Sequence, residues 1–96
     1  MLTSKQRSYL RGLANRIDSI FQIGKGGISQ NLLKQLDDAL EARELIKIHV
    51  LPNAEGDIKE IFHRLAKELS AEEVQIIGNR LVLYRPSTKN PKIELP

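Results

Sequence analysis

Residues 45–51 read Leu45-Ile46-Lys47-Ile48-His49-Val50-Leu51. The β-branched residues at the even positions share one side of an extended chain, whereas Lys47 and His49 share the other. Pro52-Asn53 follows at once and favours a turn. The stretch therefore predicts a strand with one buried face and one polar face.

Upstream of this strand the sequence predicts a helix, a short strand and an earlier helix. Ser29 is a suitable N-cap, and leucines at helical spacing follow it up to Leu40. Residues 19–23 form an apolar run rich in strand-forming residues. Between Thr3 and Ile17 the apolar residues again recur at helical spacing and predict the first helix.

Downstream, a third helix and a hairpin are predicted. Asp57 begins an amphipathic pattern that ends near Leu69, with Glu60 at the position of a capping box. Residues 73–77 and 80–85 are apolar runs separated by Gly78-Asn79, a pair suited to a two-residue hairpin turn.

The predicted fold class is α/β, with the order α-β-α-β-α-β-β and a mixed four-stranded sheet. Strand-helix-strand passages favour parallel pairing, and the final hairpin adds an antiparallel pair. Residues 1–86 form the predicted domain. Residues 87–96 contain two prolines and several polar residues, and they predict a flexible tail.

The composition limits the kinds of protein that this chain can be. Its 96 residues fit one domain. Cysteine is absent, which excludes disulfides and thiolate chemistry. The first residues lack the apolar stretch of a signal peptide, so we expect a cytoplasmic protein without a membrane partner.

The positive charge is unevenly distributed. The formal net charge is +3. Residues 1–30 hold five basic residues against one acid, whereas residues 31–80 hold seven against ten. This asymmetry predicts contact with a polyanion near the start of the chain.

The segment Gly24-Lys25-Gly26-Gly27 joins a predicted strand to a predicted helix. Backbone N–H groups at a helix N-terminus attract anions, and glycines allow a phosphate to approach closely. Lys25 adds a positive charge. A glycine-bearing turn that serves only the fold explains the same letters, so both interpretations stay open.

Two nucleotide-binding motifs do not fit this segment. A Walker loop places Ser or Thr directly after its lysine, where this chain has Gly26. A dinucleotide-binding loop ends in Gly or Ala, where this chain has Ser29, and the chain is too short for that fold. G-x-x-G remains, the loop with which KH domains hold a nucleotide backbone.

Three separated segments resemble the signature of one family. They are residues 2–11 (Leu2-Thr3-Ser4-Lys5-Gln6-Arg7-Ser8-Tyr9-Leu10-Arg11), residues 22–29 (Gln22-Ile23-Gly24-Lys25-Gly26-Gly27-Ile28-Ser29) and residues 42–47 (Ala42-Arg43-Glu44-Leu45-Ile46-Lys47). In this order they resemble the CRM domain, the chloroplast RNA splicing and ribosome maturation module, in its stand-alone bacterial YhbY-like form. The resemblance spans about residues 2–85.

The resemblance implies a fold similar to the C-terminal domain of translation initiation factor three. It also implies binding to structured RNA, with ribosomal RNA of the large-subunit precursor as the target and ribosome assembly as the process. The family's RNA-binding positions fall on Gly24, Lys25, Gly26 and Gly27 in the loop, and on Lys5, Arg7 and Arg11 in the first helix. We expect these two regions to form one surface.

Lys47 and Arg80 are further candidates for RNA contact, although exposed cations on a sheet also occur without function. No acid, base or nucleophile motif points to an enzyme, and His49 and His63 have no metal-ligand spacing. We therefore expect no catalytic residue, metal or cofactor, and a monomer. The alternative is an adaptor that docks on a ribosomal protein or assembly factor.

Overall fold

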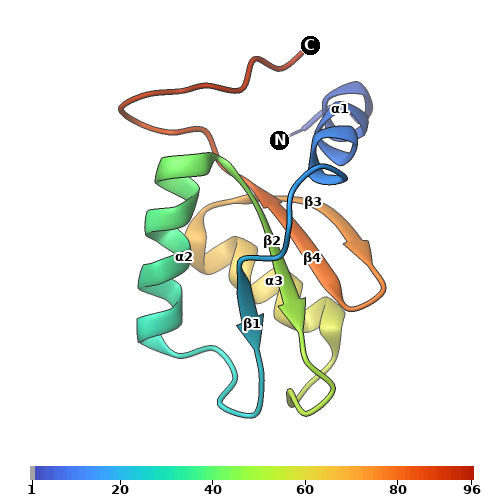
Figure 1. Ribbon diagram of the computed structural model, residues 1–96, viewed down its shortest axis with the longest axis vertical. Helices are drawn as coiled ribbons and strands as arrows, with labels where there is room; N and C mark the ends of the chain where they lie inside the picture. The colour runs from blue at the N-terminus through green and yellow to red at the C-terminus, as the bar shows by residue number, and fades with distance from the viewer. Residues whose placement is uncertain (1) are drawn as a thin grey trace.

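A computed structural model describes residues 2–96. The predicted order of elements is confirmed (Figure 1), and the elements are α1 (Ser4–Ala14), β1 (Phe21–Ile23), α2 (Gln30–Arg43), β2 (Leu45–Val50), α3 (Ile58–Leu69), β3 (Glu72–Ile77) and β4 (Arg80–Tyr84). Within residues 2–96, no helix has the length and apolar content needed to cross a membrane.

The four strands form one mixed sheet in the order β1-β2-β4-β3. β1 pairs with β2 in parallel, as the strand-helix-strand passage predicts, whereas β4 is antiparallel to both of its neighbours. The hairpin turn begins with Gly78 at φ +57, a conformation that favours glycine. The hairpin folds back so that β4, not β3, lies beside β2.

Alternation along β2 gives the sheet two different faces. Ile46, Ile48 and Val50 belong to a buried cluster with the apolar sides of α2 and α3. Leu45 points to the opposite face and belongs to a second cluster, in which Leu10 and Ala14 of α1 are fully buried. The predicted separation of the two sides of this strand is therefore confirmed.

α1 covers only part of its face of the sheet. Its cluster includes Leu45 at the start of β2, Val82 in the middle of β4 and Tyr84 at the end of β4. Lys47 and His49 follow Leu45 on the same face but line a polar hollow instead. The uncovered part of the sheet thus lies between α1 and the ends of β1 and β2.

Two helix starts differ in how they are capped. Thr3 caps α1 with a capping box, because its side chain accepts from the Gln6 N–H and the Gln6 side chain accepts from the Thr3 N–H. The capping box expected at Asp57 and Glu60 was wrong, since Asp57 makes no side-chain cap hydrogen bond. α3 still starts there because its apolar stripe packs on the sheet.

The last residues cross the C-terminal end of α2 (Figure 1) and contain no helix or strand. Two glutamates hold them, and we call Glu41 and Glu44 the glutamate clamp. The Glu44 carboxylate accepts from the N–H groups of Ser87, Lys92 and Ile93 at 2.7–2.8 Å. The flexibility of residues 87–96 stays a prediction, and no local pattern in the sequence predicted these anchors.

Candidate functional site

The loop of residues 24–27 forms a tight turn between β1 and α2. The Gly27 N–H donates to the Gly24 carbonyl at 3.0 Å, and Gly27 has a φ of +65. A side chain at Gly27 would be strained by that backbone conformation. Gly26 has no positive φ, and a Cβ there would meet nothing within 4 Å. The fold therefore requires glycine at position 27 but not at position 26.

Several N–H groups of this loop are available to a ligand. Among residues 2–96, nothing accepts a hydrogen bond from the N–H of Lys25, Gly26 or Ile28. At the start of α2 the Ser29 side chain accepts from the Leu32 N–H at 3.0 Å, which caps the helix. Unpaired amides beside a helix N-terminus are suited to bind an anion.

Charges on one side of the loop oppose an anion. A hollow of about 400 Å³ is lined by the loop and by the start of α3, including Glu55, Asp57 and Glu60. Lys25 and Arg64 are its only cations. A phosphate chain is therefore repelled from the α3 side and favoured on the other side of the loop.

The structure does not bring the loop and the first helix together. The 24–29 turn lies at one end of the longest axis, and α1 lies at the opposite end (Figure 1). The expectation that both form one continuous surface was therefore wrong. Its cause is the segment 15–20, which runs from the end of α1 to β1.

The three cations of α1 differ in their surroundings. Lys5 and Arg11 are exposed to solvent. Arg7 is half-buried, and its Nε donates to the Glu73 carbonyl of β3 at 3.4 Å. Arg7 therefore contributes to the packing of α1 on β3 and is less available to a ligand than the other two.

Polar residues line up across the uncovered part of the sheet. Gln22, His49 and Arg80 lie directly opposite one another on β1, β2 and β4. Together with Lys47 they line a hollow of about 300 Å³. We call these four residues the open sheet face. It lies between α1 and the 24–27 loop, so the two predicted cations Lys47 and Arg80 belong to one site.

The open sheet face contains an unsatisfied hydroxyl. The Ser19 Oγ is buried at the edge of this hollow and has no hydrogen-bond partner among residues 2–96. Buried polar atoms normally have a partner. Lys47 and Arg80 also form no ion pair with any acid of residues 2–96. These groups are therefore free to interact with a bound anion.

Other charged groups are used by the fold itself. Arg85 donates from Nη1 to the Asp37 carboxylate at 2.6 Å and to the Leu69 carbonyl at 2.9 Å. His63 lies 2.6 Å from the Glu73 carboxylate. Arg80 is the first residue of β4, and Arg85 directly follows its last residue. Arg85 is held by Asp37, whereas Arg80 forms no ion pair with an acid of residues 2–96.

The two carboxyl groups of the glutamate clamp have lowered pKa values. Hydrogen bonds from the Ser87 hydroxyl and from the N–H and hydroxyl of Thr88 lower the pKa of Glu41 to about 2. Burial opposes ionisation of Glu44, but N–H groups of the tail and the charge of Lys92 outweigh it and lower its pKa. Burial, aided by the negative charge of Glu44, raises the pKa of Tyr84. Both clamp carboxylates are therefore ionised at neutral pH.

A family model for the CRS1 / YhbY (CRM) domain matches residues 2–85. The chain belongs to this family. As a CRM domain it is 50% identical over 96 residues to the Bacillus subtilis protein YqeI, named a probable RNA-binding protein, and the match covers 100% of both chains. It is 38% identical over 96 residues to a Haemophilus influenzae RNA-binding protein, covering 99% of this chain and 95% of that one.

A solved structure is also similar to this CRM domain. The solution structure of the Staphylococcus aureus protein SAV1595, described as a candidate RNA-binding protein, has a TM-score of 0.83 and 57% sequence identity. The match covers 100% of each chain. The α-β-α-β-α-β-β arrangement is thus shared along the whole chain, including the tail.

Proposed function

We propose that this CRM domain binds structured RNA through its sugar-phosphate backbone and does not alter it chemically. Two groups of free donors carry the proposal: the unpaired amides of the 24–27 loop, and the unpaired cations of the open sheet face, to which β1 contributes Gln22 just before the loop begins. The names of the relatives, which are described as RNA-binding proteins, support RNA as the polyanion.

The path of the RNA follows from the charges around the loop. Glu55, Asp57 and Glu60 occupy the α3 side and repel phosphate. Lys47 and Arg80 occupy the sheet side and attract it. The RNA therefore runs from the loop onto the open sheet face.

The RNA target in this proposal is ribosomal RNA of the large-subunit precursor, bound by a monomer in the cytoplasm during ribosome assembly. This part rests on the family resemblance alone. Crosslinking in cells followed by sequencing of the attached RNA tests it. Enrichment of large-subunit precursor RNA is expected, and enrichment of only messenger or transfer RNA contradicts the ribosomal target.

Filter binding at several salt concentrations tests the RNA surface. Each phosphate contact contributes about 0.7–0.9 to the slope of log affinity against log salt. Replacing Lys47 and Arg80 together by Ala should weaken binding and reduce the slope by about 1.4–1.8. Lys25→Glu should also weaken binding. The control is Lys34→Ala, because Lys34 is an exposed cation of α2 that pairs with Asp38 at 3.8 Å.

Two results contradict this proposal. If the Lys47 and Arg80 double variant and Lys25→Glu keep the affinity and salt slope of the unchanged protein, the surface is wrongly assigned. If the protein stays bound to a ribosomal protein after RNase treatment and binds no RNA by itself, the adaptor function replaces RNA binding.

A further inference from the structure

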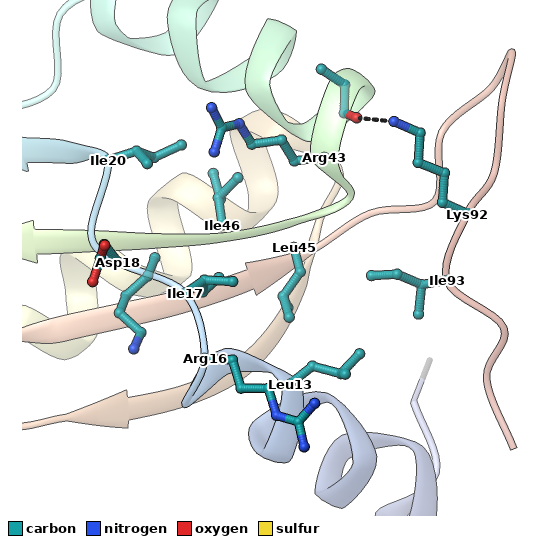
Figure 2. A pocket seen from close by; sticks show the side chains of 12 residues that line it. Leu13, Arg16, Ile17, Asp18, Ile20, Arg43, Leu45, Ile46, Lys92 and Ile93 are labelled. Atoms are coloured by element: carbon teal, nitrogen blue, oxygen red, sulfur yellow. Dashed lines mark hydrogen bonds between the residues drawn. The ribbon is translucent and has the colours of Figure 1, made fainter.

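A further hollow lies beyond the open sheet face. It has a volume of about 660 Å³ and lies where the end of α1, the start of β2, the end of α2 and the tail meet (Figure 2). Pockets that hold small organic ligands have volumes of about 300–1,000 Å³. The hollow is therefore large enough for one nucleotide.

The floor of this hollow is apolar and its rim is basic. Figure 2 shows Leu13 from α1, Leu45 from β2 and Ile93 from the tail around its centre. Arg43 of α2 and Arg16 lie on opposite sides of these residues in the same view. A flat base can lie on such an apolar surface, and its flanking phosphates can bind the cations on either side of that surface.

The cations of the rim are not neutralised by the protein. Arg16, Arg43 and Lys47 form no ion pair with an acid of residues 2–96. Lys92 is less free, because its Nζ donates to the Ala42 carbonyl at 3.4 Å and lies close to Glu44. Asp18 is the one acid of the lining, and it lies at the edge farthest from Ile93 in Figure 2.

The hollow is continuous with the proposed RNA surface. Ile17, Asp18 and Lys47 line both this hollow and the smaller one of the open sheet face. An RNA strand that crosses the open sheet face therefore reaches the hollow without leaving the basic surface.

We propose that this hollow, which we call the base pocket, receives one unstacked nucleotide of the bound RNA. The inference rests on the proposed function and adds its substrate class: RNA with a bulged or single-stranded nucleotide. The base lies on Leu45, Ile17 and Ile93, and its flanking phosphates lie against Arg43 and Arg16. In a perfect A-form duplex every base stays stacked, and none can enter.

The experiment compares two RNA hairpins that differ only in one bulged nucleotide. The unchanged protein should bind the bulged hairpin about fivefold to tenfold more tightly, which is the lower end of the range for a base on an aromatic ring, because the pocket is lined by aliphatic side chains instead. Arg43→Gln and Ile93→Ser should each remove this preference while binding to the perfect hairpin is kept. Lys34→Gln is the control on α2 and should change neither affinity.

A crosslink gives a second measurement that needs no variant. A 4-thiouridine placed at the bulge should crosslink to peptides that contain Ile17 or Ile93, whereas the same base inside the stem should not. Amide spectra of Arg43→Gln check that the fold is unchanged, which is expected because Arg43 is exposed.

The outcomes separate the two proposals. Equal binding of both hairpins by the unchanged protein, or a preference that persists in Arg43→Gln and Ile93→Ser, overturns the base pocket and leaves RNA binding intact. Binding of neither hairpin at low salt overturns the proposed function, and the base pocket with it.

Discussion

Glu44→Gln should release the tail and destabilise the protein. Glu44 is 0% exposed and stands at the end of α2 with a φ of +68, a conformation that L-residues rarely adopt. Its backbone carbonyl also accepts from the Arg85 N–H at 2.9 Å. The native structure therefore tolerates a strained residue at this position, and the contacts of its carboxylate compensate for that strain.

The size of the effect follows from the three hydrogen bonds. One carboxylate oxygen accepts from the N–H groups of Lys92 and Ile93, and the other accepts from the Ser87 N–H at 2.8 Å. Glutamine can supply only one oxygen, so its NH₂ group would face the Ser87 N–H, and Ser87 is only 7% exposed. One charge-assisted hydrogen bond is lost and a buried donor is left unpaired, which costs about 2 kcal/mol.

Two measurements test this value. Urea unfolding at pH 7 should show a loss of about 2 kcal/mol, and the melting temperature should fall by about 8–16 °C. Hydrogen exchange of the Lys92 and Ile93 amides should accelerate more than exchange of the β2 amides, because the tail detaches before the sheet opens. Glu68→Gln is the control, since Glu68 is an exposed glutamate of α3.

The pH dependence of stability provides a further test of the Glu44→Gln prediction. The pKa of Glu44 is lowered in the folded protein from an ordinary 4.5. That of Glu41 is lowered to about 2. A carboxyl with a lowered pKa stabilises the fold above its unfolded pKa, and this stability is lost as the pH falls through the folded pKa. The difference in stability between the unchanged protein and Glu44→Gln should therefore be full above pH 4.5 and shrink as the pH falls through the lowered pKa of Glu44.

The prediction fails if Glu44→Gln unfolds like the Glu68→Gln control and the Ile93 amide keeps its protection. That result would mean that the tail does not rest on the clamp in solution. A gap that grows as the pH falls would contradict the assigned direction of the pKa.

Two matched pairs of variants separate folding from binding. Gly27→Ala should cost about 1 kcal/mol of stability in urea unfolding because of the φ of +65, whereas Gly26→Ala should leave stability unchanged and weaken RNA binding in filter assays. Arg85→Ala should destabilise by about 2 kcal/mol, because Arg85 is 17% exposed and loses Asp37, while RNA affinity is kept. Arg80→Ala should do the reverse. If the two variants of either pair change stability and RNA affinity equally, the proposed separation of folding residues from binding residues is wrong.

The sequence predicted well wherever neighbouring residues determine the structure. Alternation along residues 45–51 placed Lys47 and His49 on the polar face, and Gly78-Asn79 placed the hairpin turn correctly. The capping box at Asp57 failed because packing of the apolar stripe of α3 fixes that helix start without it.

Features that depend on distant residues could not be predicted. The glutamate clamp joins residues more than 40 positions apart, and nothing in the local pattern of Glu44 marks it as buried. Arg43 and Arg16 gain their place at the base pocket only when α2 and the 15–20 segment meet. Proximity in sequence was also misleading, since α1 and the turn between β1 and α2 are close along the chain but lie at opposite ends of the molecule.

The tail connects the clamp to the base pocket. Ile93 forms one wall of the pocket, and its N–H donates to Glu44 at 2.8 Å. Whatever releases the tail therefore removes an apolar wall while Arg43, Arg16 and the open sheet face stay in place. Glu44→Gln should then retain affinity for a perfect hairpin and lose the preference for a bulged one. Affinity for the perfect hairpin should be kept because backbone contacts do not need the Ile93 wall. Loss of affinity for both hairpins would instead indicate that the clamp supports the whole RNA surface.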